Sequence, residues 1–325
     1  MSDDTLSDDS LPGIDDIRAA AERIRPHVRH TTTPRSAHLS VVTGGEVHLK
    51  LEIEQPTGSF KVRGACNAIL AARERGDLPG ITTASTGNHA RAVAYMGRQF
   101  DVPVTAFVAA SLPAYRVRAL EELGATVDVS SQDQSEAIED ARRLATDRGF
   151  AFVPPFDHPD VISGQGTIGL ELCEDLADLD AVVVPVSGGG LISGIGLAIK
   201  AIRPEALVIG VCAERAGAML RSLDAGHPVP VPEVETIATS LLGDLGADNR
   251  YTFRVASRVV DEISSVSEQQ LQDALDALAA EDGLVVEGAA AAAAAFLRAT
   301  ASRWRGKRVA LIITGDSIAS AEVPK

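Results

Sequence analysis

The sequence has few aromatic residues, few lysines and few cysteines, and these shortages narrow what the protein can be. Phe, Trp and Tyr together make up 4% of the 325 residues. A hydrophobic interior must therefore be built from Ala, Val, Leu and Ile, as in parallel sheets that helices cover on both faces. The hydrophobic content of 45% is sufficient for one large domain or for two lobes that share a core.

The three cysteines, Cys66, Cys173 and Cys212, lie far apart and form no CxxC pair. This spacing indicates small buried hydrophobic residues rather than a disulfide framework, and it is consistent with a reducing compartment. No run approaches the roughly 18 apolar residues of a membrane span, and the acidic N-terminus does not resemble a secretory signal. We therefore expect a cytoplasmic protein.

Positive charge is also scarce. The formal net charge is −15, and residues 1–17 hold six Asp but no Lys or Arg, which leaves −9 for the rest of the chain. Such a balance disfavours nucleic acid and anionic membranes as partners. Residues 1–13 are expected to form a disordered acidic leader.

Short apolar runs alternate with helical segments along most of the chain. Strands are predicted at 47–52, 81–84, 104–109, 125–129, 181–186, 207–213 and 308–313. Helices are predicted at 14–28, 61–75, 89–98, 114–123, 134–148, 165–176, 190–202 and 216–225. This rhythm is typical of an α/β protein with open twisted parallel sheets and helices on both faces. Residues 226–250 are interpreted as a long surface excursion, and the seven alanines at 289–295 as a buried helix.

The chain contains only five lysines, which are Lys50, Lys61, Lys200, Lys307 and Lys325. Lys61 differs from the other four, which look ordinary, because it follows the turn 57–60 at the start of a predicted helix. The helix dipole disfavours a cation there and lowers the pKa of the amine, and a Schiff-base nucleophile must be a neutral amine. Taken alone, however, the position is better explained as a solvated lysine in a loop.

Three adjacent glycines, Gly188, Gly189 and Gly190, follow Ser187 between a predicted strand and a predicted helix. Glycine lets the backbone approach an anion, and the amides at a helix start point toward it, so a phosphate site is favoured over a merely flexible turn. The segment matches neither GxGxxG nor GxxxxGK[ST], which argues against a nucleotide-binding module. A phosphate site without a nucleotide motif, together with an unusual lysine, points to pyridoxal phosphate (PLP).

Two further turns follow predicted strands. Ser85-Thr86-Gly87-Asn88-His89 brings hydroxyl, amide and backbone N–H groups together, where they could hold a carboxylate, cap the next helix, or do both. Thr314-Gly315-Asp316-Ser317 follows the last strand, on the side of the sheet where ligands of open α/β folds bind, although it could equally be a plain turn.

Together these four segments resemble the serine/threonine dehydratase family of fold-type II PLP enzymes, over about residues 14–320. Thr57–Ala65 is similar to the cofactor-lysine motif of the family, and Ser85–His89 to its asparagine loop. Val161–Thr167 is similar to a further family motif, and Ser187–Leu191 to its phosphate cup. Each likeness alone is moderately specific, but their shared order and spacing are highly specific.

The resemblance implies two α/β lobes with PLP in the cleft between them. Residues 1–72 and 161–325 would form the large PLP-binding lobe, and residues 73–160 a smaller lobe that closes on the substrate. No regulatory amino-acid-binding domain is expected after the catalytic part. A homodimer is expected from the likeness alone.

The resemblance also implies roles for individual residues around the cofactor. Lys61 would carry PLP as a Schiff base and remove the Cα proton of the substrate. Phe60 would pack beside the ring, Asn88 would hydrogen-bond its 3-hydroxyl, and Thr314 would face its pyridine nitrogen. The residues that would bind the phosphate are Ser187, Gly188, Gly189 and Gly190. The residues that would bind the small amino-acid substrate are Ser85, Thr86, Asn88 and His89.

The implied activity is the conversion of a small β-hydroxy amino acid, of the L-threonine or L-serine type, to a 2-keto acid and ammonia. Family racemases use a serine as a second catalytic base where this chain has Thr86, so a racemase or a β-replacement enzyme on the same scaffold stays open. A hydroxyectoine-degradation dehydratase also stays open, because Asp248–Phe253 resembles that subgroup. A non-catalytic PLP carrier is a remote alternative, since a carrier needs no substrate pocket.

No metal is expected. Family members with a divalent-cation site have a Glu followed by an Asp six residues later, whereas here Glu214 is followed by Leu220. The sequence also departs from the family where Gly288 follows Glu287 and where Asp316 follows Gly315. These departures bear on substrate specificity rather than on the cofactor.

Overall fold

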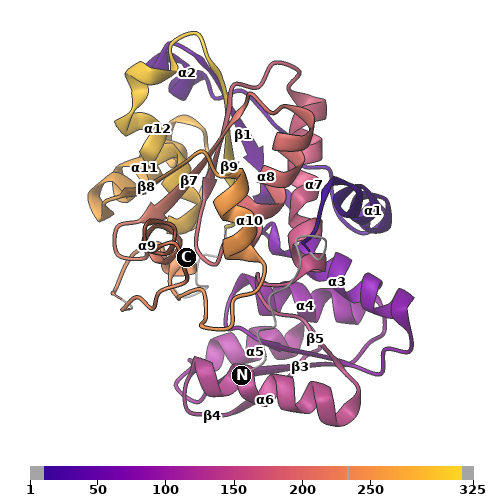
Figure 1. Ribbon diagram of the computed structural model, residues 1–325. Helices are drawn as coiled ribbons and strands as arrows, with labels where there is room; N and C mark the ends of the chain where they lie inside the picture. The colour runs from indigo at the N-terminus through magenta and orange to yellow at the C-terminus, as the bar shows by residue number, and fades with distance from the viewer. Residues whose placement is uncertain (1–10, 233, 317–325) are drawn as a thin grey trace.

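The computed structural model describes residues 11–232 and 234–316. Most of the predicted acidic leader, and Ser317 of the last predicted turn, lie outside the described residues. Within the described part, nine strands form two wholly parallel sheets, which occupy the upper and the lower part of Figure 1.

The larger sheet has five strands in the order β1-β9-β6-β7-β8. Their bounds are β1 (Glu46–Leu51), β6 (Ala181–Pro185), β7 (Leu207–Ala213), β8 (Glu262–Val266) and β9 (Arg308–Ile313). One face packs against α7 (Pro159–Asp175), α8 (Gly190–Ile202), α9 (Ala218–Ala225) and α10 (Thr252–Val259). The other packs against α2 (Ala37–Thr43), α11 (Glu268–Glu281) and α12 (Ala292–Ala299). The central strands are buried apolar runs because helices cover both of their faces.

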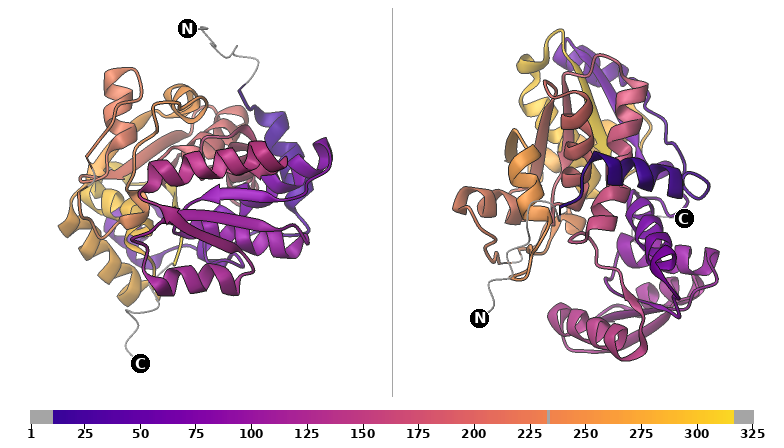
Figure 2. Two further views of the ribbon diagram at one scale, coloured as in Figure 1. Left: turned by 90° about the horizontal axis from the view of Figure 1, so that it is seen from below. Right: turned by 45° about the vertical axis from the view of Figure 1, so that its right-hand side comes forward.

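The smaller sheet has four strands in the order β4-β3-β2-β5. Their bounds are β2 (Ile81–Ala84), β3 (Val104–Ala109), β4 (Thr126–Ser131) and β5 (Ala151–Phe152). Helices α3 (Lys61–Arg75), α4 (Asn88–Gln99) and α5 (Ala114–Glu122) cover one face, and α6 (Gln134–Arg148) covers the other. Figure 2 shows this sheet and its helices at one end of the molecule. Helix α3 connects the two sheets, since it also packs against α7 and α1 (Ile14–Ile24).

The predicted fold class is confirmed, but several elements differ from their predicted bounds. Strand β8 was not predicted because it is an edge strand whose sequence, Glu-Ile-Ser-Ser-Val, lacks a continuous apolar run. Strand β5 has only two residues, too few for a pattern. Helix α7 begins at Pro159, six residues before the predicted start, because a proline suits the first turn of a helix and His158 caps it.

Two unusual segments are largely as predicted. The alanine run is buried, as η4 (Gly288–Ala291) followed by α12. Among the described residues of 226–250, which omit 233, the one short turn of helix is η3 (Thr239–Leu241). They are only partly a surface excursion, however, because Ala238 and Leu241 are buried in the core of the larger sheet.

The prediction that the cysteines are buried holds for two of the three. Cys66 and Cys212 are buried, Cys173 is partly buried, and all three are free. Among the described residues, no helix is both long and apolar enough to cross a membrane.

Candidate active site

Lys61 is the first residue of α3, at the carboxyl end of the larger sheet. The turn before it pairs with the segment that follows β9: the Phe60 N–H donates to the Thr314 carbonyl (3.1 Å), and the Asp316 N–H donates to the Gly58 carbonyl (3.0 Å). Gly58 has a φ of 69°, which favours glycine, and a Cβ there would lie 2.1 Å from an Asp316 carboxylate oxygen, which would have to move. Two segments that are about 250 residues apart in sequence therefore fix the position of the lysine.

The Lys61 amine lies in a site with little compensation for positive charge. Its Nζ donates to the Pro155 carbonyl (2.7 Å), and no described carboxylate forms an ion pair with it. Burial lowers the pKa of this amine to about 8, although Glu287 acts in the opposite direction. The lowered pKa was predicted, but its main cause is desolvation rather than the helix dipole. The amine is therefore partly neutral near physiological pH, as a nucleophile or base requires.

The glycine turn (Ser187–Gly190) connects β6 to α8, and its glycines are required by their neighbours. A Cβ on Gly188 would lie 2.4 Å from the Phe156 ring, and a Cβ on Gly189 would lie 2.3 Å from Met219 Cε. Gly189 also has a φ of 86°. Among the described side chains, none caps the start of α8, so its first N–H groups are available to an anion.

The asparagine loop (Ser85–His89) leads into α4, and its asparagine contacts an acidic residue, Glu287, that lies between α11 and η4 beside the larger sheet. Asn88 Nδ2 donates to both carboxylate oxygens of Glu287, at 3.2 and 3.1 Å. Ser240 Oγ donates to the same carboxylate at 3.0 Å. Burial raises the pKa of Glu287, and these hydrogen bonds oppose the shift. Gly315 lies against the pair, since a Cβ on it would be 3.0 Å from Glu287 and 3.2 Å from Asn88.

Sequence reasoning assigned no role to Glu287, which was notable only for the Gly288 that follows it. The acidic side chain two residues before a run of alanines was the one available signal. Its partners, Asn88 and Ser240, are distant in sequence, and only the tertiary structure identifies them.

The structure favours a different role for His89 from the predicted one. Its Nε2 lies 3.0 Å from the Val153 carbonyl, so this nitrogen must carry the proton and donate it. Burial first, and then Lys61, lower the pKa of His89 to about 3, so the ring is neutral and its Nδ1 can only accept. A ring in this state anchors α4 beside β5 but has no proton to offer a substrate carboxylate.

Ser85 and Thr86 are partly exposed, and neither caps α4. Of the two explanations for this loop, helix capping by a side chain is therefore wrong. The first N–H groups of α4 and the two hydroxyls remain available to a carboxylate.

Several buried polar atoms around Lys61 lack a hydrogen-bond partner among the described residues. They are Thr57 Oγ1, Ser59 Oγ, Asn88 Oδ1 and Thr314 Oγ1. Leaving such atoms unpaired costs about 1–3 kcal/mol each, so a cluster of them indicates a ligand. The hydroxyls, the amide oxygen and the uncapped glycine turn fit a group with a phosphate, a phenolic hydroxyl and a ring nitrogen, as PLP has.

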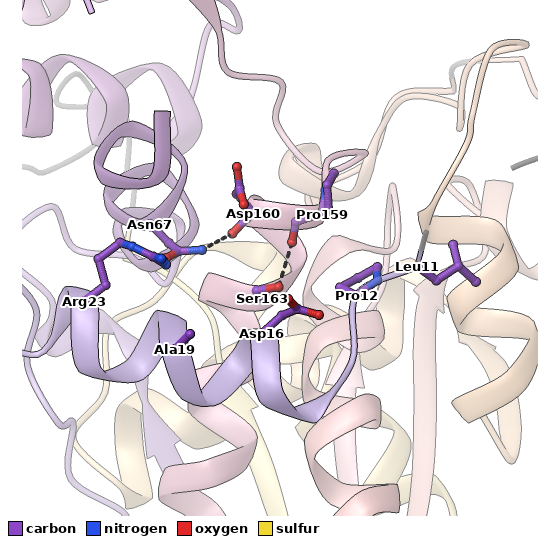
Figure 3. Close-up of a pocket in the computed structure, with 9 residues that line it drawn as sticks. All are labelled: Leu11, Pro12, Asp16, Ala19, Arg23, Asn67, Pro159, Asp160 and Ser163. Carbon is purple, nitrogen blue, oxygen red and sulfur yellow. Dashed lines mark hydrogen bonds between the residues drawn. The ribbon is translucent and has the colours of Figure 1, made fainter. Parts of the chain in front are cut away.

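A separate hollow of about 210 Å³ lies between α1, α3 and α7 (Figure 3), and none of the predicted site residues lines it. Its polar side chains already bond to the protein. Arg23 donates to Asn67 Oδ1 (2.6 Å), Asn67 donates to the Asp160 carbonyl (2.7 Å), and Ser163 donates to the Pro159 carbonyl (2.9 Å). This hollow therefore gives no indication of a ligand.

The described residues also contain no group of three or more His, Cys, Asp or Glu side chains that could hold a metal ion. Glu214, at the position where some family members bind a cation, lies at the end of β7, where its N–H donates to the Val266 carbonyl.

Known proteins resemble this chain over nearly its whole length. A family model described as pyridoxal-phosphate dependent enzyme matches residues 24–315. The chain is 40% identical over 309 residues to an L-threonine ammonia-lyase of Thermotoga maritima, across 94% of this chain and 75% of that protein. It is 35% identical over 307 residues to a catabolic L-threonine dehydratase of Escherichia coli, across 94% and 93% of the two chains.

Solved structures give the same result. A threonine deaminase from T.th. has a TM-score of 0.87 and 35% identity, with 94% of this chain and 99% of that chain covered. Maize serine racemase also has a TM-score of 0.87, with 31% identity and 96% and 95% coverage. The chain therefore belongs to the serine/threonine dehydratase family of pyridoxal-phosphate-dependent enzymes.

Proposed function

We propose that this protein is a PLP-dependent ammonia-lyase that converts a small β-hydroxy amino acid, L-threonine or L-serine, to a 2-keto acid and ammonia. The observation that carries the proposal is the Lys61 amine, whose pKa is lowered to about 8. The segments around this amine contain buried polar atoms that have no hydrogen-bond partner among the described residues. The substrate class is supported by the relatives named L-threonine ammonia-lyase and L-threonine dehydratase.

Bound PLP supplies the electron-withdrawing ring that makes the Cα proton of an amino acid acidic. We assign its phosphate to the glycine turn, its 3-hydroxyl to Asn88, its ring nitrogen to Thr314 and its ring face to Phe60. The unpaired Asn88 Oδ1 and Thr314 Oγ1 support these two assignments. As the partner of the ring nitrogen, the Thr314 hydroxyl would leave that nitrogen largely unprotonated, which would suit elimination.

The protein's own groups bind, orient and move the proton. Lys61 Nζ takes the Cα proton, and the Pro155 carbonyl holds this amine in place (2.7 Å). Glu287 accepts from Asn88 and so fixes the orientation of its amide. Ser85, Thr86 and the uncapped N–H groups of α4 receive the substrate carboxylate. A near-neutral pKa lets Lys61 both accept and return a proton at physiological pH.

Racemisation is the main competing activity. It differs from elimination in that it needs a second base on the face opposite Lys61. Thr86 stands where family racemases have a serine. Among the described residues, Thr86 has no hydrogen-bonded basic group to take its proton, which favours elimination over racemisation.

Other parts of the proposal concern the whole molecule. We propose a cytoplasmic homodimer, with lobes at 1–72 plus 161–325 and at 73–160, of which the smaller closes on the substrate. A substrate derived from hydroxyectoine stays a prediction from the Asp248–Phe253 segment.

The deciding experiment compares the wild type with Lys61→Ala and with Lys307→Ala as a matched lysine control. Keto acid and ammonia are measured with L-threonine, L-serine and 3-hydroxyaspartate, and visible absorption is recorded with PLP bound. We expect Lys61→Ala to lose at least about a thousandfold in rate together with the absorption band, and Lys307→Ala to lose neither. Turnover that retains the amino group and inverts Cα would instead indicate a racemase.

A further inference from the structure

Three successive residues of the loop between β5 and α7 contact Lys61, the glycine turn and the segment that begins α10. The Pro155 carbonyl accepts from Lys61 Nζ. The Phe156 ring fills the space where a Cβ on Gly188 would lie. Asp157 reaches a segment more than 90 residues later in the chain.

Asp157 acts as a cap for α10, a helix to which it does not belong. Its Oδ2 accepts from the Arg250 N–H (2.7 Å), and its Oδ1 accepts from the N–H groups of Tyr251 (2.9 Å) and Thr252 (2.8 Å). Helix N-termini favour a carboxylate in this position, because it satisfies unpaired N–H groups and complements the helix dipole. Hydrogen bonds to a charged acceptor are also stronger than neutral ones.

Thr252 connects this cap to the glycine turn. The residue is wholly buried, and a Cβ on Gly189 would lie 3.3 Å from its Cβ. Its carbonyl accepts from Ser193 Oγ of α8 (3.2 Å). Asp157 is thus connected to the glycine turn by Thr252, whereas its neighbour Phe156 packs against the glycine turn directly.

A second and weaker tie joins the same segment to the smaller sheet. Arg142 of α6 pairs with Asp248 at 2.6 Å, but both side chains are more than half exposed. Exposed pairs contribute about 0–1 kcal/mol, so this contact adds little compared with the three N–H bonds to Asp157. The contacts of Asp157 therefore hold the 248–252 segment more firmly than the Arg142 pair does, and Asn249 adds a hydrogen bond within the segment, from its Nδ2 to Thr252 Oγ1 (2.8 Å).

We propose that Asp157 is a positioning residue for the phosphate of PLP: by capping α10 it holds Thr252, and with Phe156 it sets the shape of the glycine turn. This inference rests on the proposed placement of the phosphate at the glycine turn. Asp157 itself touches neither the phosphate nor the substrate in this scheme.

The test uses the holoenzyme and Asp157→Asn, which preserves size but turns one acceptor into a donor that faces backbone N–H groups. We expect the dissociation constant for PLP to rise roughly tenfold. The ³¹P resonance of the bound cofactor should shift, and the visible absorption band of the Lys61 linkage should remain. The matched control is Asp160→Asn, three residues later in the first turn of α7, whose carboxylate pairs with Arg75 (2.8 Å) instead, and it should change neither quantity.

An Asp157→Asn protein that folds, binds PLP within twofold of the control and keeps its ³¹P resonance would overturn the inference. If that variant does not fold, Asn249→Ala provides the second test, because Asn249 Oδ1 accepts from the Phe253 N–H on the same helix (3.0 Å). It should weaken PLP binding in the same direction by a smaller factor, and unchanged binding would again overturn the inference. A wild-type protein that binds no PLP would refute the proposed function itself.

Discussion

Two lysines of this protein lie in opposite electrostatic environments. Lys50, on β1, is fully buried and surrounded by acceptors, with Glu171 at 2.7 Å, Asp175 at 3.3 Å and the Thr31 carbonyl at 2.8 Å. Lys61 has one carbonyl as its hydrogen-bond acceptor and a pKa lowered to about 8. The comparison shows that carboxylates form ion pairs with the Lys50 amine, whereas no described carboxylate forms an ion pair with the Lys61 amine, for which we propose a chemical role.

Both environments depend on the same stretch of α3. Arg63, two residues after Lys61, is fully buried and pairs with Glu52 (2.8 Å) and Glu171 (2.5 Å). Burial alone would raise the pKa of Glu52, but Arg63 outweighs it and the pKa is lowered. The ionic cluster of Glu52, Arg63, Glu171 and Lys50 therefore anchors the first turn of the helix that begins with Lys61.

The largest expected effect comes from breaking this cluster. Arg63→Met should lower the free energy of unfolding by about 3–5 kcal/mol, because it leaves Glu52 buried without its partner. Arg75→Gln is the control, since Arg75 is 61% exposed and its pair with Asp160 should contribute less than about 1 kcal/mol. Urea unfolding measures the free energy of unfolding of both variants. Equal losses would contradict the expected difference between the buried and the exposed ion pair.

A smaller loss is expected from Lys50→Met. The Thr31 carbonyl would lose its donor, and Asp175 would keep only His30 and Thr33. Glu171 would still pair with Arg63, so the expected cost is about 1–3 kcal/mol. A variant as stable as the wild type at pH 7 would show that the buried amine adds nothing beyond its packing.

The smallest expected effect is a gain in stability rather than a loss. In PLP-free protein, Lys61→Met should raise the free energy of unfolding by about 1–2 kcal/mol at pH 7, because burying this amine favours its neutral form. The folded pKa of about 8 lies below the ordinary 10.5, so the gain is complete below pH 8. It should fade as the pH rises toward 10.5, where the amine becomes neutral in the unfolded chain as well. Urea unfolding at about pH 7 and about pH 10 checks the sign, and destabilisation at the lower pH would refute it.

Much of the site could be predicted from sequence because its backbone has local requirements. Gly188 and Gly189 follow a strand and precede a helix, where side chains would collide with neighbours, and Lys61 follows a turn that needs Gly58. By contrast, His89 was assigned to the substrate although its one proton is used by the Val153 carbonyl. A histidine in the first turn of a helix gives no sign, in sequence alone, of which nitrogen is protonated.

Lys50 is a second residue whose environment could not be predicted from the sequence. In sequence it is one lysine in an alternating strand, and it looks ordinary. Its burial follows from the packing of β1 near the C-terminal end of α7, which brings Glu171 and Asp175 to it from about 120 residues away.

The sequence by itself determined the parallel α/β fold and the turns after the strands, because hydrophobic periodicity and glycine requirements are local properties. Only the tertiary structure decided which charged groups meet. Asp157 reaches α10, Glu287 reaches Asn88, and Lys50 reaches Glu171 across long stretches of chain. The physical reason is that electrostatic partners are chosen by distance in space, and that distance is set by how the helices pack on the two sheets.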